Sequence, residues 1–271
     1  MSGGVEAELA FSFIRTAARP AKPRQSGLTF LADRGMGLNR LADIVDTAGD
    51  HIDFFKMGIG AWRILRSDLL KRKIAALKQS DIGVFLAGDV TEAAFVQGVS
   101  RRFYEAVKDY GADAVEVSSA QIAMALDDKC ALISMAGDAG LRVVAEVGQK
   151  GHADWTRSQS YVFRQIEAYQ KAGAWKVLVQ ADGISEDVES NRWDVVLAIA
   201  ARFELNDLIF QAKDVAAQEW YVSTFGNKVN LDVDDHQALE LELIRRGIRK
   251  RHIFGLVGSL DAGASNEGAR S

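Results

Sequence analysis

The sequence alternates eight short apolar segments, rich in β-branched and aromatic residues, with longer segments of helical period. This alternation is typical of parallel βα units. Eight strands, each followed by a helix, are the number that closes a (β/α)8 barrel, the TIM barrel of the α/β class. An open doubly wound sheet usually has fewer strands and a glycine-rich loop after the first, and here no GxGxxG follows a strand. The expected strand segments are 27–33, 52–58, 83–89, 113–119, 141–148, 175–182, 207–214 and 228–232.

Apolar stripes between these segments predict the helices. One stripe begins after Thr91 and Glu92 and predicts a single helix that reaches Tyr110. Glycines at the ends of several helical segments predict C-caps. The members of the first stripe are Val96, Val99, Phe103, Ala106 and Tyr110; later stripes comprise Val162, Ile166 and Tyr169, then Leu241, Ile244 and Ile248; the expected caps are Gly49, Gly111, Gly140 and Gly173.

The length and composition are those of one barrel domain. A chain of 271 residues with 48% hydrophobic residues can fill a single barrel core. We expect an N-terminal arm over residues 1–26, the barrel over 27–257 and a disordered tail over 258–271.

Charge and cysteine content exclude several classes of function. The formal net charge is −4, which gives no basic face for nucleic acid. The single cysteine, Cys130, allows no disulfide framework and indicates a reducing compartment, so we expect a cytoplasmic protein.

No apolar run is long enough to span a membrane, and none resembles a signal peptide. Amphipathic outer helices and the N-terminal arm make a homo-oligomer plausible.

The active site of a barrel forms at the C-terminal ends of its strands, where this sequence has many polar residues. Lysines there would neutralise a small anionic substrate, and carboxylates would hold a hard divalent cation or move protons. Lys56, Glu116 and Glu146 interrupt apolar segments, where a charge is costly unless it faces a polar site, so a functional role is favoured over a structural one. The strand-end residues are Asp33, Arg34, Lys56, Asp89, Glu116, Ser118, Glu146, Lys150, Gln180, Asp182, Gln211, Lys213, Asn230 and Asp232.

Asp89 and His152 each have an alternative role that does not involve the active site. Asp89 precedes a helical segment and could cap that helix instead of serving a substrate. The histidines show no zinc-binding spacing, and His152, the nearest to the expected site, could be a surface residue or a general acid.

From Gly27 to Arg249 the sequence resembles the phosphosulfolactate synthase family. The resemblance rests on GLTFLADRGMGL, on AGDHIDFFKMGIGAW (similar to GDYIDFxKxGxGT), on GADAVEVSSA (similar to GFDAIEISDG), on EVGQK, on FGNKVNL (similar to FGPNVNL) and on LELIRRGIR (similar to LExLRRGLR). It implies a barrel that adds sulfite to phosphoenolpyruvate with Mg²⁺.

The resemblance also implies roles for individual residues. Lys56 and Lys150 would bind the anionic substrates or protonate the enolpyruvate carbon. Glu116 and Glu146 would be positioned for metal binding or proton transfer, and Glu146 is the third expected catalytic residue. Glu116 and Asp89 are the expected metal ligands. The expected substrate-binding residues are Asp33, Arg34, Ser118, Gln180, Asp182, Gln211, Asn230 and Asp232.

The sequence departs from the family pattern mainly in the last three strands. Gln180 and Gln211 stand where the family has carboxylates, Asp182 stands where an arginine is expected, and NLDVDD replaces NLGNI, which puts Asp232 in place of glycine. A phosphate near Asp182 would meet repulsion instead of a clamp. Three functions stay open: a lyase of the family type, the same barrel with specificity for a non-phosphorylated carboxylic acid, and a non-catalytic interaction protein like the heat-stress-associated relatives in plants.

Overall fold

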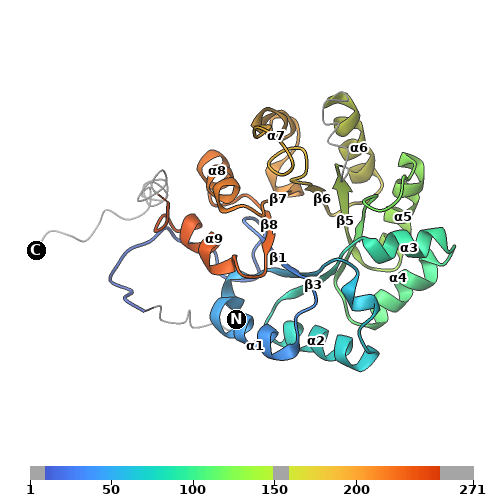
Figure 1. Cartoon of the computed structure of the whole chain (residues 1–271), viewed down its shortest axis with the longest axis horizontal. Helices are drawn as coiled ribbons and strands as arrows, with labels where there is room; N and C mark the ends of the chain where they lie inside the picture. The colour runs from blue at the N-terminus through green and yellow to red at the C-terminus, as the bar shows by residue number, and fades with distance from the viewer. Residues whose placement is uncertain (1–9, 149–158, 251–271) are drawn as a thin grey trace, which may run out of the picture.

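The computed structural model describes residues 10–148 and 159–250, and in this part the strands form one closed parallel barrel in sequence order (Figure 1). Each strand pairs with the next, and β8 pairs with β1 to close the ring. The predicted (β/α)8 barrel is therefore confirmed. The strands are β1 (Thr29–Asp33), β2 (Phe54–Met57), β3 (Gly83–Leu86), β4 (Ala114–Val117), β5 (Arg142–Val147), β6 (Lys176–Val179), β7 (Leu208–Gln211) and β8 (Leu231–Asp234).

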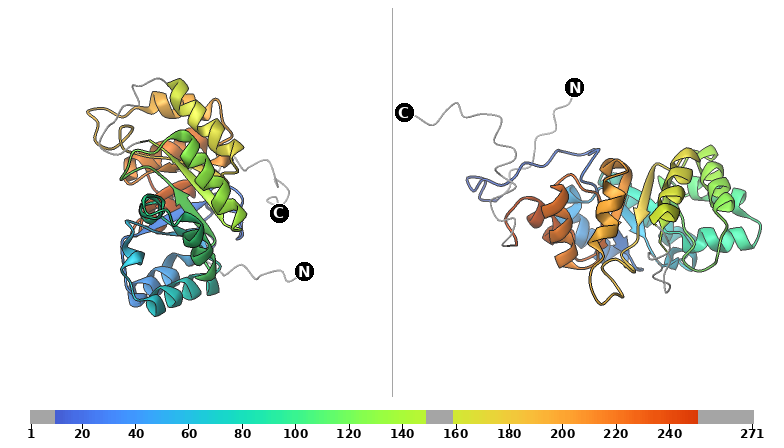
Figure 2. Two further views of the ribbon diagram at one scale, coloured as in Figure 1. Left: turned by 90° about the vertical axis from the view of Figure 1, so that its right-hand side faces the viewer. Right: turned by 90° about the horizontal axis from the view of Figure 1, so that it is seen from above.

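Helices surround the barrel and cover its outer face (Figures 1 and 2). Their apolar sides pack on the outward-facing strand residues in one continuous core. The helices are α1 (Leu38–Ala48), α2 (Ser67–Gln79), α3 (Asp89–Val96), α4 (Ser100–Asp109), α5 (Leu126–Asp138), α6 (Gln159–Lys171), α7 (Trp193–Ala200), α8 (Val215–Phe225) and α9 (Ala238–Arg245), with short 3-10 turns at Gly49–His51, Ala61–Arg63 and Leu205–Asp207.

A separate apolar cluster fills the inside of the barrel. Successive side chains of a strand point to opposite faces, so this cluster identifies which residues of each strand point inward. Gly83 makes room for it, because a Cβ at this position would overlap the ring of Phe54. The members of the inner cluster are Leu28, Phe30, Phe54, Phe85, Ala114, Val144, Leu178 and Ile209.

The single helix predicted from Thr91 to Tyr110 is wrong. The structure has two helices, α3 and α4, because Gly98 adopts a left-handed φ of +68° and ends the first one. The register then changes, so Tyr104 and Val107 face the core, while Val96 is 67% exposed.

The other helix predictions hold in part. Val162, Ile166 and Tyr169 are buried on α6, as are Leu241 and Ile244 on α9, but Ile248 lies beyond the end of α9 and is exposed. Gly111, Gly140 and Gly173 follow helices with positive φ, whereas Gly49 has a φ of −54° and opens a 3-10 turn.

The segment before β1 packs on the N-terminal end of the barrel. Arg19 contacts Glu242 of α9 at 3.2 Å, and Arg24 contacts Asp53 at 3.1 Å. The right panel of Figure 2 shows this segment in dark blue at the opposite end of the barrel from the β6–α7 loop. The buried Arg245 donates to the carbonyl oxygens of Leu28 and Val229 and so ties β1 to β8 at the same end.

No helix within the described ranges 10–148 and 159–250 is long and apolar enough to cross a membrane.

Candidate active site

The inward side chains change from apolar to polar at the C-terminal end of the barrel. The strand alternation that places the inner cluster puts the next inward position of several strands at this end. Small residues occupy this level on β1 (Ala32) and just after β3 (Ala87), which leaves room for longer side chains from neighbouring strands. The polar inward residues are Lys56, Glu116, Glu146, Gln180, Gln211 and Asp232.

A chain of alternating charges crosses this end of the barrel. Lys56 Nζ lies 2.7 Å from Glu116 Oε2 and 3.3 Å from Asp232 Oδ2, and Asp232 Oδ1 lies 3.0 Å from Lys213 Nζ. Lys213 Nζ is also 3.4 Å from Asp234 Oδ1. Lys56, Glu116 and Asp232 are buried, so each of these charges depends on its neighbours for compensation.

The surroundings of Lys56 keep it protonated. Burial alone would lower its pKa, but the carboxylates of Glu116, Asp232 and Glu146 outweigh burial and raise the pKa above its ordinary value. Burial would raise the pKa of Asp232, but Lys213 and Lys56 outweigh it and lower that pKa. Both groups are therefore ionised at neutral pH. The negative charge that the sequence places at Asp232 is thus compensated by two lysines.

Glu116 is fixed by two elements. Its Oε1 accepts a hydrogen bond from the backbone N–H of Gly88 at 3.1 Å, and its Oε2 faces Lys56. Gly88 has to be glycine, since a Cβ there would overlap the hydroxyl of Ser118 and lie 3.0 Å from Glu116 Oε1. The close approach of Gly88 therefore orients the carboxylate toward Lys56.

Glu92, which sequence reasoning did not select, organises the loop after β4. This buried carboxylate on α3 accepts a hydrogen bond from the Ser118 hydroxyl and from the backbone N–H groups of Ala120 and Ile122, at 2.8 and 2.9 Å. Ser118, predicted to bind substrate, is buried and engaged in this network.

Asp33, also predicted to bind substrate, holds the loop between β1 and α1. Its Oδ1 accepts hydrogen bonds from the N–H groups of Gly35 and Met36, both at 2.7 Å, and its Oδ2 lies 2.5 Å from Nζ of Lys73. Lys73 comes from α2, is buried, and also donates to the Met36 carbonyl oxygen at 2.8 Å. In contrast, the neighbouring Arg34 is mostly exposed at the rim, 3.9 Å from Asp234.

Gln180 and Gln211 differ in the hydrogen bonds of their side-chain amides. Gln180 is 1% exposed, and neither its amide nitrogen nor its amide oxygen has a hydrogen-bond partner within the described ranges. Gln211 accepts a hydrogen bond from the N–H of Ala181 at 3.2 Å. A buried, unpartnered amide is costly, so Gln180 is suited to hydrogen-bond a ligand.

The loop after β6 carries several acidic side chains. Asp182 forms an isolated parallel bridge with Glu186 in this loop. Burial raises the pKa of Glu186; Lys213 opposes this effect, and Asp234, Asp182 and Asp187 add to it. Lys213 therefore faces a cluster of carboxylates on the β6 and β8 side of the site.

Asn230 is not at this end of the barrel, and its placement among the strand-end site residues is wrong. It precedes β8, which runs to Asp234 and not to the expected Asp232. Its side chain accepts from the N–H of Leu28 at 2.9 Å and donates to the carbonyl oxygens of Asn206 and Leu208. Asn230 therefore joins β8 to the starts of β1 and β7 at the N-terminal end.

The expected metal ligands, Glu116 and Asp89, lie on neighbouring elements. Asp89 is the first residue of α3 and not the end of a strand, and its Oδ1 accepts a hydrogen bond from Gln121 Nε2 at 3.0 Å. Among residues 10–148 and 159–250, no group of three or more His, Cys, Asp or Glu side chains could hold a metal ion. Mg²⁺ commonly uses only one or two protein carboxylates and completes its shell with water and substrate oxygens, so a larger carboxylate cluster is not required for it.

Lys150 and His152 lie outside the described residues. Glu146, the remaining predicted catalytic residue, is buried on β5, and its charge helps to raise the pKa of Lys56. The structure thus brings Lys56, Glu116, Glu146, Gln180 and Asp232 to one end of the barrel interior.

Comparisons with known proteins assign the family. The family model of (2R)-phospho-3-sulfolactate synthase (ComA) matches residues 17–251. The chain is 32% identical to the phosphosulfolactate synthase of Bacillus subtilis over 87% of this chain and 96% of that one. It is 29% identical to the phosphosulfolactate synthase of Methanothermobacter thermautotrophicus over 89% of this chain and 96% of that one.

A solved structure supports the fold alone. The 3-hexulose-6-phosphate synthase from Salmonella typhimurium superposes with a TM-score of 0.57 at 14% identity, over 82% of this chain and all of that chain. The family match confirms the expectation of an enzyme of the lyase type. This chain therefore belongs to the (2R)-phospho-3-sulfolactate synthase family.

Proposed function

We propose that this enzyme adds sulfite to phosphoenolpyruvate, or to a closely related unsaturated acid, at the C-terminal end of the barrel. The substrate pair follows from the reaction for which the relatives are named. The observation that carries the proposal is the buried, protonated Lys56 inside the barrel, held between Glu116 and Asp232. A fixed cation in a site of low dielectric suits a reaction in which negative charge develops on the substrate.

The addition needs one new bond and one proton. The sulfur lone pair of sulfite attacks the methylene carbon C3, and the π electrons of the C2–C3 double bond move to C2 and into the neighbouring carboxylate. A proton delivered to C2 then gives phosphosulfolactate, and the phosphate ester is retained. The step with the largest charge development is the attack, so stabilising the resulting enolate lowers the barrier.

Lys56 is suited to stabilise that charge. Because its pKa is raised, it is a weak acid and would act as a fixed positive charge instead of the proton donor. Gln180 would supply a neutral donor to a substrate oxygen, since its amide has no partner among the described residues. Lys150 remains the predicted proton donor.

Magnesium would be held by Glu116 and Asp89 together with substrate and water oxygens, and when bound it would supply Lewis-acid stabilisation of the substrate's carboxylate.

A second candidate function is the same addition chemistry on a non-phosphorylated carboxylic acid. It is favoured by the carboxylates of Asp182 and Glu186 in the loop after β6. Glu186 interacts with Lys213 after β7 and with Asp234 at the end of β8, on the side where barrels commonly hold phosphate. These carboxylates would repel a phosphate dianion unless Lys213 and the metal compensate them.

Ligand-induced thermal stabilisation distinguishes the two functions. Phosphoenolpyruvate at millimolar concentration with Mg²⁺ should raise the Tm of the wild type. The variant Lys56→Met should lose this shift, whereas Lys228→Met, which removes an exposed lysine outside the site, should keep it. No shift with phosphoenolpyruvate, together with a shift for unphosphorylated unsaturated acids, would refute the first function and favour the second.

We also infer that the enzyme works in the cytoplasm and as a homo-oligomer. The absence of a disulfide framework supports a reducing compartment. Exposed apolar side chains on outer helices, such as Leu197, Leu239 and Leu243, support self-association. Sedimentation analysis would show an oligomer, and a monomer at micromolar concentration would contradict this inference.

A further inference from the structure

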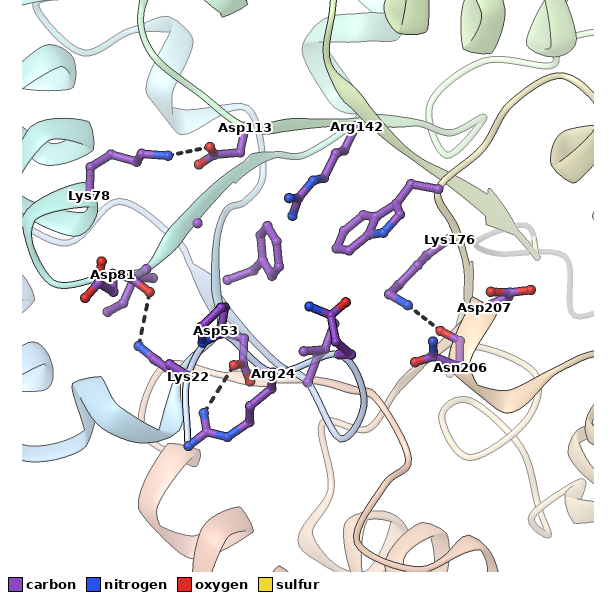
Figure 3. Close-up of a pocket in the computed structure, with 17 residues that line it drawn as sticks. Lys22, Arg24, Asp53, Lys78, Asp81, Asp113, Arg142, Lys176, Asn206 and Asp207 are labelled. Carbon is purple, nitrogen blue, oxygen red and sulfur yellow. Dashed lines mark hydrogen bonds and ion pairs between the residues drawn. The ribbon is translucent and has the colours of Figure 1, made fainter. Parts of the chain in front are cut away.

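A cavity lies at the N-terminal end of the barrel, opposite the candidate active site. Its volume is about 570 Å³, and it is bounded by the starts of the inner strands and by the segment that precedes β1 (Figure 3). This volume is within the range of small-molecule sites. The catalytic proposal makes no use of any of its residues.

The charges that line this cavity are not balanced. Five side chains are cationic and four are acidic, so one positive charge is in excess. Two ion pairs, Arg24 with Asp53 and Lys78 with Asp113, compensate two charges of each sign. Three cations therefore remain against two carboxylates. These are Lys22, Arg142 and Lys176 against Asp81 and Asp207.

Arg142 presents an uncommitted guanidinium to the cavity. It is the first residue of β5, and within the described ranges its side chain has no hydrogen bond and no ion pair. Its guanidinium carbon lies 5.0 Å from the ring centre of Trp175 and 5.7 Å from that of Phe54. These rings contact each other, with centres 5.1 Å apart. The aromatic contacts position the guanidinium and leave its N–H donors available.

Lys176 presents a second cation from the adjacent strand β6. Its residue is 4% exposed, and its ammonium group donates to the carbonyl oxygen of Asn206 and lies 5.0 Å from the centre of the Trp175 ring. Burial lowers the pKa of Lys176 to about 8; Asp207 opposes this effect, and Arg142 adds to it. Lys176 is therefore a mostly protonated, buried group whose charge is disfavoured by its neighbour.

Figure 3 shows Arg142 and Lys176 extending into the same cavity; they come from the adjacent strands β5 and β6, and each lies 5.0 Å from the centre of the Trp175 ring. Two like charges that share a cavity repel each other, and an anion placed between them would satisfy both. A guanidinium binds a carboxylate or a phosphate through two parallel hydrogen bonds, and the neighbouring aromatic surface suits an apolar body attached to that group.

We propose that this cavity is a second ligand site, in which Arg142 and Lys176 bind a small organic anion through its carboxylate or phosphate group. The site is separate from the sulfite-addition site, because the two lie at opposite ends of the barrel strands. Its ligand is a small molecule and not a polyanion, since the cavity is bounded by Trp175, Phe54 and the segment before β1.

Calorimetric titration at pH 7 tests this proposal with two probes, inorganic phosphate and acetate, which distinguish the two head groups. Arg142→Gln should weaken binding of the better probe about tenfold or more, the usual effect of losing a charge-assisted hydrogen bond. Lys176→Met should have a similar effect. Arg101→Gln, which removes an exposed arginine at the start of α4, should leave binding unchanged.

Arg142 is exposed and makes no polar contact in the described part of the chain, so its replacement should not unfold the barrel. Binding that Arg142→Gln leaves unchanged would place the anion elsewhere and overturn the proposal. Failure of the wild type to bind either probe at millimolar concentration would overturn it as well.

Discussion

Replacing Lys73 with methionine removes the counterion of a buried carboxylate and so tests whether Asp33 is a structural residue. Both side chains are at most 2% exposed, and Nζ lies 2.5 Å from Oδ2. Breaking a buried ion pair by removing one partner costs about 3–5 kcal/mol. Because Asp33 keeps two backbone N–H donors at 2.7 Å, we expect the lower end of that range, about 3 kcal/mol.

The assay is thermal unfolding followed by circular dichroism. For a domain of this size, about 3 kcal/mol corresponds to a fall in Tm of roughly 6–12 °C. Lys71→Met is the matched control, since Lys71 is exposed on the same helix and its loss should change stability by less than about 1 kcal/mol. The double variant Asp33→Asn with Lys73→Met should be less destabilised than the sum of the single variants.

If Lys73→Met loses less than about 1 kcal/mol, the pair is not a buried anchor of the β1–α1 loop. If Asp33→Asn also abolishes activity without a loss of stability, Asp33 binds substrate directly, as the sequence predicts.

Three further predictions follow from the two ends of the barrel. Gly88→Ala should destabilise the protein by about 1–3 kcal/mol and reduce kcat, because its Cβ would displace the Ser118 hydroxyl; urea unfolding and steady-state kinetics measure both effects. Lys213→Met removes one of the two counterions of Asp232, so the pKa of Asp232 should rise and the acid limb of the pH–rate profile should move to higher pH. An acid limb at the same pH as in the wild type would contradict this. The pKa of Lys176 is about 8 in the folded state and 10.5 ordinarily. Between these pH values the unfolded chain therefore binds more protons than the folded one, so the free energy of unfolding rises with pH. Lys176→Met should lose that rise between pH 8 and 10.5, and an identical pH profile in the variant would show that the lysine is not buried as described.

The fold could be predicted from the sequence because the strand and helix alternation is a global pattern that small boundary errors do not change. Lys56, Glu116 and Glu146 could also be identified, since a charge inside an apolar strand must face a polar region. Asn230 is misplaced because the expected strand 228–232 lies too early in the chain, whereas β8 runs from Leu231 to Asp234. Alternation shows that a residue points inward but not which end of the barrel it faces, and an error of two residues in a strand exchanges the ends.

The buried charges of Lys73 and Glu92 also have a signal in the sequence. Lys73 falls on the apolar face of α2, one helical turn from Leu70 and Leu77, where a lysine requires a buried partner. Glu92 similarly sits at a buried position of α3. In contrast, the contact of Lys213 with Asp232 could not be predicted, because it joins the segment after β7 to β8, and only the folded barrel defines the relative register of these two strands.

We propose that the charged end of the barrel performs the addition of sulfite to phosphoenolpyruvate. The most direct measurement is phosphorus NMR with mass spectrometry on the purified enzyme incubated with phosphoenolpyruvate, sulfite and Mg²⁺. We expect the wild type to form a new phosphate ester whose mass equals the sum of the two substrates, and Lys56→Met not to form it. Consumption of neither substrate by the folded wild-type enzyme, with the metal present, would contradict it.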